Sequence, residues 1–239
     1  MKYLISICIL LTSEIGIYAQ ISLQSYVDFG KNNVSEGLFI KNVYRSNYQY
    51  QNYTIEAGVQ FDLVSPNPKI LTGIDISCSR AFLIKDFPFA LKGFFMLNRF
   101  SDLQHETNFG FRLETKKLQH FLFEMGTNFK TYTINSAARE EYNISRQNSK
   151  LSENFNLIYL ATVYLKPHQN HWNVGLSLTN IDYYIINQST NPVFYLQFRY
   201  GLRPKTIWYM DAWYKQAGIF NINANYFGYF FRGGIKIEL

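Results

Sequence analysis

The sequence predicts an all-β fold, an antiparallel up-and-down β-barrel of about twelve strands (roughly ten to fourteen) that spans a membrane. Apolar and polar residues alternate in segment after segment, and Gly, Asn and Pro separate the segments. Past the N-terminus no apolar run reaches the roughly 18 residues that a membrane helix needs. Aromatic residues make up 18% of the 239 residues, which excludes a disordered chain.

The C-terminal stretch "NYFGYFFRGGIKIEL" shows the alternation most clearly. Aromatic residues stand at every second position, namely Phe227, Tyr229 and Phe231, and Ile235 follows on the same face. Glycine or charged residues lie between most of them. Successive side chains of a strand point to opposite faces, so one face is apolar and the other is polar or bare.

Further segments of this kind recur along the whole chain, and no helical period is sustained. The expected strands begin near Ile21, Leu38, Tyr53, Leu71, Phe89, Glu106, His120, Phe155, Trp172, Val193, Thr206 and Asn225.

The connections between these strands alternate in length. Those after even-numbered strands are short and polar, such as "QYQN" and "RPK". Those after odd-numbered strands include the long segment Ser136–Asn154. Outer-membrane barrels have short periplasmic turns and longer outer loops, so the short turns are expected in the periplasm. Lipid cannot satisfy free backbone groups, so the last strand is expected to pair with the first, Ile21–Phe29.

The N-terminus has the layout of a secretory signal peptide. Lys2 precedes an apolar run from Tyr3 to Leu11, and Ala19 ends a plausible cleavage site. We therefore expect a signal peptide at residues 1–19 and a transmembrane barrel at residues 20–239. Cys78 is then the one remaining cysteine, which excludes an intrachain disulfide and a metal–thiolate cluster.

The signal peptide with Gln20 at the expected mature start, the aromatic-rich strands and the end "FFRGGIKIEL" together resemble outer-membrane β-barrel proteins of the Bacteroidota. The resemblance covers the whole chain as a style of sequence. It implies a location in the outer membrane, contact with outer-membrane lipids and insertion by the barrel assembly machinery. Such barrels commonly end in an aromatic residue, whereas this chain ends in Leu239. The resemblance implies no substrate.

The sequence does not indicate an enzyme or a cofactor site. His105 is the one histidine expected outside, with Ser101 and Glu106 nearby but in no recognisable catalytic motif. His168 and His171 in "HQNH" are spaced for a metal only on a helix, and a short turn is expected there. The basic residues do not gather in a stripe, so no nucleic-acid partner is expected.

The inner face of the predicted barrel carries charges of both signs. The candidate functional residues, structural or pore-lining, are Lys41, Arg45, Glu56, Asp62, Asp75, Lys92, Arg112, Glu114, Glu124, Lys130, Asp211, Arg232 and Lys236. The two signs nearly balance. A pore selective for one sign of ion would favour one sign of charge, so the balance indicates paired charges across the lumen.

These observations favour a non-enzymatic binding or assembly protein of the outer membrane that acts through its surface loops, chiefly Ser136–Asn154, on an envelope protein partner. The alternative is a narrow, porin-like channel for small polar solutes. A more distant alternative is an outer-membrane lipid-modifying hydrolase.

Overall fold

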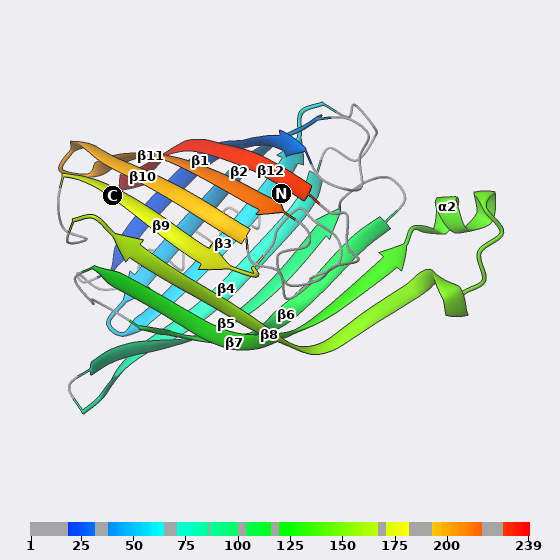
Figure 1. The fold of residues 1–239 in the computed structure, drawn as a ribbon, viewed down its shortest axis with the longest axis horizontal. Coiled ribbons are helices and arrows are strands. Elements are labelled where there is room, and N and C mark those ends of the chain that lie inside the picture. Colours follow the sequence, from blue (N-terminus) through cyan, green and yellow to red (C-terminus); the bar gives the residue numbers. More distant parts are fainter. Residues whose placement is uncertain are drawn as a thin grey trace, which may run out of the picture.

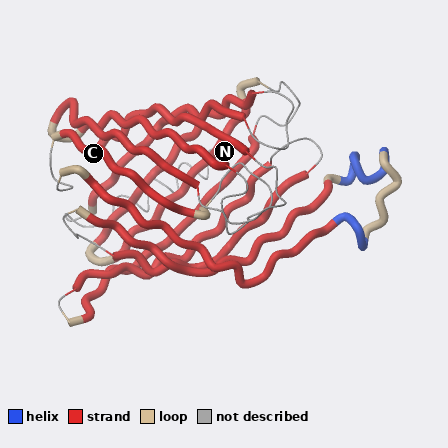
Figure 2. The backbone as a smooth tube through the Cα atoms, in the orientation of Figure 1, coloured by secondary structure: helices blue, strands red, loops and turns tan. Residues whose placement is uncertain are grey.

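The chain forms one closed antiparallel barrel (Figures 1 and 2). The computed structural model describes residues 19–31, 38–64, 71–85, 87–99, 104–115, 120–166, 171–181, 193–216 and 227–239. The expected signal peptide and most of the expected outer loops lie outside these ranges. The strands are β1 (Gln20–Lys31), β2 (Leu38–Tyr50), β3 (Tyr53–Asp62), β4 (Leu71–Ile84), β5 (Phe87–Arg99), β6 (Gln104–Thr115), β7 (Phe121–Ile134), β8 (Lys150–Tyr164), β9 (Trp172–Thr179), β10 (Val193–Arg203), β11 (Thr206–Gln216) and β12 (Phe227–Glu238).

Each strand pairs with its neighbours in the chain, and β12 pairs with β1 to close the ring. The seam runs from Ser22 opposite Glu238 to Lys31 opposite Tyr229. The N–H of Leu239 extends it by donating to the carbonyl of Ile21 at 2.8 Å. The expected closure and the expected number of strands are confirmed.

The outer face of the wall is apolar over its whole circumference. Leu23, Ile76, Phe111 and Leu176 are between 47% and 58% exposed, and they come from strands all around the barrel. Their chain neighbours point inward. In water such a surface would be strongly unfavourable, whereas it suits contact with lipid acyl chains.

Aromatic rings fill one side of the interior. The ring of Trp213 on β11 stacks between Tyr195 of β10 and Phe230 of β12, with centroids 4.1 Å apart on each side. Phe39 of β2 packs against Phe230 across the seam. These side chains give the barrel an apolar core on the β10–β12 side, away from the ion pairs of β3–β5.

The two ends of the barrel differ. At the end where β1 begins, two-residue turns join β2 to β3 and β10 to β11. The connection between β7 and β8 reaches beyond the opposite end and carries the helix α2 (Ser136–Glu141) (Figure 1). Within the described residues no helix is long and apolar enough to cross a membrane.

The expectation of an unpatterned loop over Ser136–Asn154 is wrong. α2 and the 3₁₀ turn Gln147–Ser149 occupy part of it. β8 begins at Lys150, five residues before the expected start at Phe155, and its first residues pair with the C-terminal part of β7. A helix of six residues is less than two turns, so it leaves no periodicity to detect.

We predict that the outer face tolerates charge according to depth. Leu176 lies in the middle of β9, so Leu176→Arg should lower the free energy of unfolding by about 2–4 kcal/mol. Leu165 lies just past the end of β8, so Leu165→Arg should lower it by only about 0–1 kcal/mol. Denaturant unfolding in lipid vesicles measures both. Equal costs would contradict the assigned lipid face.

Candidate functional site in the charged inner wall

A row of alternating charges crosses the seam on the inner face. Asp211 of β11 lies opposite Arg232 of β12, which lies opposite Asp28 of β1. Asp28 in turn lies opposite Lys41 of β2, and Lys41 opposite Asp62 of β3. We call these five residues the charge row. Each member has a neighbour of opposite sign on the adjacent strand, so the row stabilises the native register.

Arg232 of the charge row is fixed by hydrogen bonds and by aromatic rings. Its Nε and Nη2 donate to the two carboxylate oxygens of Asp28 at 2.7 and 2.8 Å. Its guanidinium lies 4.0 Å from the ring centroid of Tyr26 and 4.8 Å from that of Trp213. Two parallel hydrogen bonds and two ring faces fix the guanidinium in place. Asp28 is fully buried, so it depends on this partner.

A second set of charges runs from β2 to β7 and is linked pair by pair. We call these six residues the ion-pair track: Arg45 and Asp75 (2.8 Å), Lys92 and Glu56 (2.6 Å), and Arg112 and Glu124 (2.9 Å). Glu56 also lies in the field of Arg45, and Glu124 in that of Lys92. The three pairs therefore form one electrostatic network with alternating sign.

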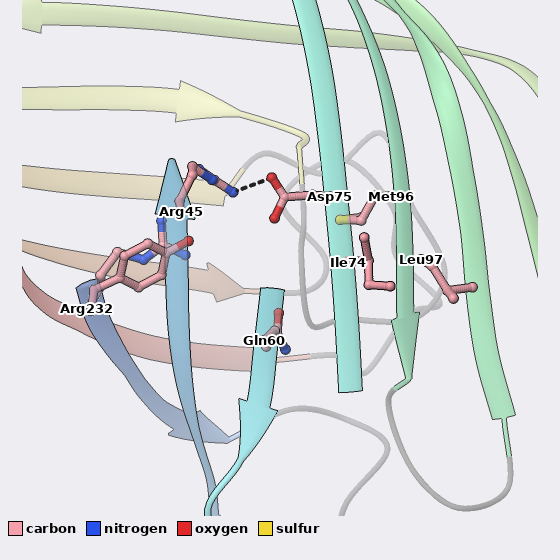
Figure 3. A pocket seen from close by; sticks show the side chains of 8 residues that line it. Arg45, Gln60, Ile74, Asp75, Met96, Leu97 and Arg232 are labelled. Atoms are coloured by element: carbon pink, nitrogen blue, oxygen red, sulfur yellow. Dashed lines mark hydrogen bonds and ion pairs between the residues drawn. The ribbon is translucent and has the colours of Figure 1, made fainter. Parts of the chain in front are cut away.

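The first pair of the track bridges two strands that are not adjacent. Arg45 of β2 and Asp75 of β4 both lie opposite Gly58 of β3. A Cβ atom on residue 58 would lie 2.3 Å from the Asp75 carboxylate, so any larger residue would have to displace the carboxylate from this position. Figure 3 shows the pair spanning β3, with Arg232 and Gln60 beside it.

A small cavity lies beside this pair. A cavity of about 20 Å³, enough for one water, lies between Tyr26, Arg45, Gln60, Asp75 and Arg232, together with apolar side chains of β4 and β5. At the end of the barrel a cavity of about 680 Å³ is lined by Arg199, Lys236 and Glu238, among others. Lys236 follows Arg232 by four residues, so the two cavities lie about 13 Å apart along β12.

The inner charges fall into two groups by exposure. Asp28, Lys41 and Lys130 are at most 2% exposed, and Lys41 donates to the carbonyl of Arg99. By contrast, the side chains of Arg45 and Asp75 are 22% and 28% exposed, and those of Lys92 and Glu56 are also partly exposed. The first group acts as a scaffold within the wall, and the second borders open space.

The other predicted residues lie along the same inner face. Lys236 pairs with Glu238 at 2.9 Å near the strand end. Glu114 lies opposite Glu124, next to Arg112. The carboxylate of Asp62 accepts from the backbone N–H of Val64. The structure thus brings Arg45, Asp75, Glu56 and Lys92 together on one side of the lumen, and Lys236 lies apart from them.

Inner charges absent from the predicted set include Asp28 and Glu238, described above, and two further residues, Arg199 and Glu106. Arg199 pairs with Asp211 at 2.8 Å, and its guanidinium lies over the ring of Tyr209. Glu106 pairs with Lys130 at 3.3 Å, and both are buried. The alternation places both residues on the inner face and could have found them. Glu106 was considered only beside His105, at the expected start of a strand, whereas β6 begins at Gln104.

The described histidines lie in separate parts of the wall. His105 lies 2.9 Å from the side-chain oxygen of Asn135, while its neighbour Glu106 points into the wall. The ring of His171 packs against Tyr200. His168 and Ser101 lie outside the described residues. No group of three metal-ligating side chains occurs in the described ranges.

Several solved structures share this fold. The KdgM porin in complex with disordered oligogalacturonate has a TM-score of 0.54 and 9% identity, over 90% of this chain and 98% of that one. An outer membrane channel from Pseudomonas putida F1 has a TM-score of 0.54 and 9% identity, over 94% and 97%. The NanC porin has a TM-score of 0.51 and 14% identity, over 90% and 100%.

No family model and no curated protein sequence matches the chain. At such low identities the similarity shows the fold alone, which is that of outer-membrane porins and channels. The resemblance to proteins of the Bacteroidota remains a prediction.

We predict that Arg232→Leu lowers the free energy of unfolding by about 3–5 kcal/mol, because it leaves the buried carboxylate of Asp28 without its main partner. Asp28→Asn combined with Arg232→Gln should recover at least half of the loss. Tryptophan fluorescence during denaturant unfolding in vesicles measures both. A double variant as unstable as Arg232→Leu would show that the loss of stability comes from altered packing rather than from an unpaired charge.

We also predict that Gly58→Ala costs about 1–3 kcal/mol by displacing the Asp75 carboxylate. In an Asp75→Ala background the same change should cost much less, since the colliding group is gone. The four unfolding free energies of this double-mutant cycle measure the coupling. A coupling of zero would contradict the close approach seen here.

Proposed function

We propose that this protein is a narrow channel in the outer membrane for small polar solutes. The observation that carries the proposal is the ion-pair track, whose pairs Arg45–Asp75 and Lys92–Glu56 are partly exposed on the inner face of a closed barrel. A purely structural interior has no need of charges that border open space. The similarity to porins and to an outer membrane channel supports the same reading.

The inner wall argues against a preference for acidic chains. One porin of similar fold is described in complex with oligogalacturonate, an acidic oligosaccharide. In this chain Arg45, Lys92, Arg112 and Arg199 each have a carboxylate within 2.9 Å. Neutralised cations offer little attraction to a polyanion, so the proposed solutes are small and carry no large net charge.

The proposed cellular setting follows from the sequence. The chain would be exported by a signal peptide at residues 1–19, inserted by the barrel assembly machinery, and surrounded by outer-membrane lipids. The short turns would face the periplasm, and the connection that carries α2 would face outward.

The comparisons favour the channel over the binding or assembly role expected first. The described neighbours are porins and channels rather than enzymes, so the hydrolase alternative also has less support. α2 and the ends of β7 and β8 give the outer connection a defined form, but nothing in them indicates a particular partner.

The channel proposal predicts a steady but small conductance in planar bilayers, below that of porins with 16 or more strands measured in the same salt. Asn47→Trp, on the inner face beside Glu56, should reduce the conductance by at least about half by filling the lumen. Ser46→Trp, one residue away on the outer face, is the matched control and should leave it unchanged. A wild-type protein that inserts and conducts no ions would overturn the proposal.

A further inference from the structure

We propose that the ion-pair track selects zwitterionic solutes, small molecules that carry an ammonium and a carboxylate, such as α-amino acids and short peptides. This inference rests on the proposed channel and names the class of solute that the channel favours. It depends on three features of the track: unused hydrogen-bonding capacity, alternation of sign, and position midway along the strands.

The first feature is the unused capacity of the central residues. An ammonium has three donors, and Lys92 hydrogen-bonds only Glu56 within the described residues. Arg45 uses one carboxylate oxygen of Asp75 and leaves the other, which borders Gly58. These side chains are partly exposed, so a solute can reach a donor and an acceptor without first breaking an ion pair.

The second feature is that neighbouring charges of the track have opposite signs. Asp75 follows Arg45, and Glu56 lies between Arg45 and Lys92 in the electrostatic network. A carboxylate on a solute can meet Lys92 while its ammonium meets Asp75 or Glu56. A solute with one sign of charge meets a repelling group beside every attracting one.

The third feature is location. Arg45 and Lys92 lie near the middle of β2 and β5, whereas the similarly exposed pair Lys236–Glu238 lines the cavity of about 680 Å³ at the strand ends. A solute that crosses the barrel has to pass the track, because the track lies about halfway along the wall. At the wide end it can keep its distance, so the mouth pair contributes less.

Solute-driven swelling of proteoliposomes tests the inference. The probes are glycylglycine, a zwitterion, and N-acetylglycinamide, a neutral molecule of similar size. With the wild-type protein, glycylglycine should enter roughly fourfold faster than N-acetylglycinamide. A factor of about four is the Boltzmann factor for attraction by one opposite unit charge about 5 Å away in water. Glu56→Gln with Lys92→Gln removes one pair without changing the net charge, and should bring the ratio close to one.

Lys236→Gln with Glu238→Gln is the matched control, because it removes an ion pair of similar exposure at the wide end. It should keep the wild-type ratio. If the Glu56 and Lys92 variant fails to insert, Arg45→Gln with Asp75→Asn tests the adjacent pair in the same way. A wild-type ratio near one, or a ratio that survives loss of a track pair, would overturn the inference.

These outcomes are distinct from failure of the channel itself. If neither probe enters through the wild-type protein, the proposed function is wrong. If both enter at equal rates, the channel stands and its selectivity for zwitterions does not.

Discussion

The pairing of β12 with β1 is the constraint on which the rest of the structure depends. Lipid offers no hydrogen bonds to an open strand edge, so a sheet with this apolar outer face is stable in a membrane only when it is closed. The seam aligns Asp28 with Arg232, and the charge row continues from there to β11, β2 and β3. Closure of the barrel therefore also fixes the arrangement of these inner charges.

The charge row and the ion-pair track both consist of ion pairs, but they differ in burial and in the role that burial allows. The charge row is largely buried: Asp28 relies on Arg232, whose guanidinium is held by two rings. A buried charge without its partner is costly, so the row opposes any slip of the strands at the seam. The track is partly exposed and lies beside open space. Its charges remain available to a solute because the register is maintained elsewhere.

Stacked aromatic rings occupy part of the lumen. Tyr195, Trp213 and Phe230 stack across β10, β11 and β12 and fill that part. Gly58 lets the Arg45–Asp75 pair lie close against β3, and this pair borders the same small cavity as Arg232, whose guanidinium lies over the Trp213 ring.

The strict alternation of residues was enough to predict the barrel, its strand number, its apolar outer face and which side chains point inward, because a strand exposes every second side chain to one face. It did not predict that β8 begins at Lys150, since pairing with β7 extends that strand beyond its own pattern. Nor did it identify the partners: Arg45 reaches Asp75 across a third strand over Gly58, residues that are 30 positions apart. Which charges are buried and which border open space depends on strand register and on how the aromatic rings fill the lumen. Both arise only when distant segments pack together, so they belong to the tertiary structure.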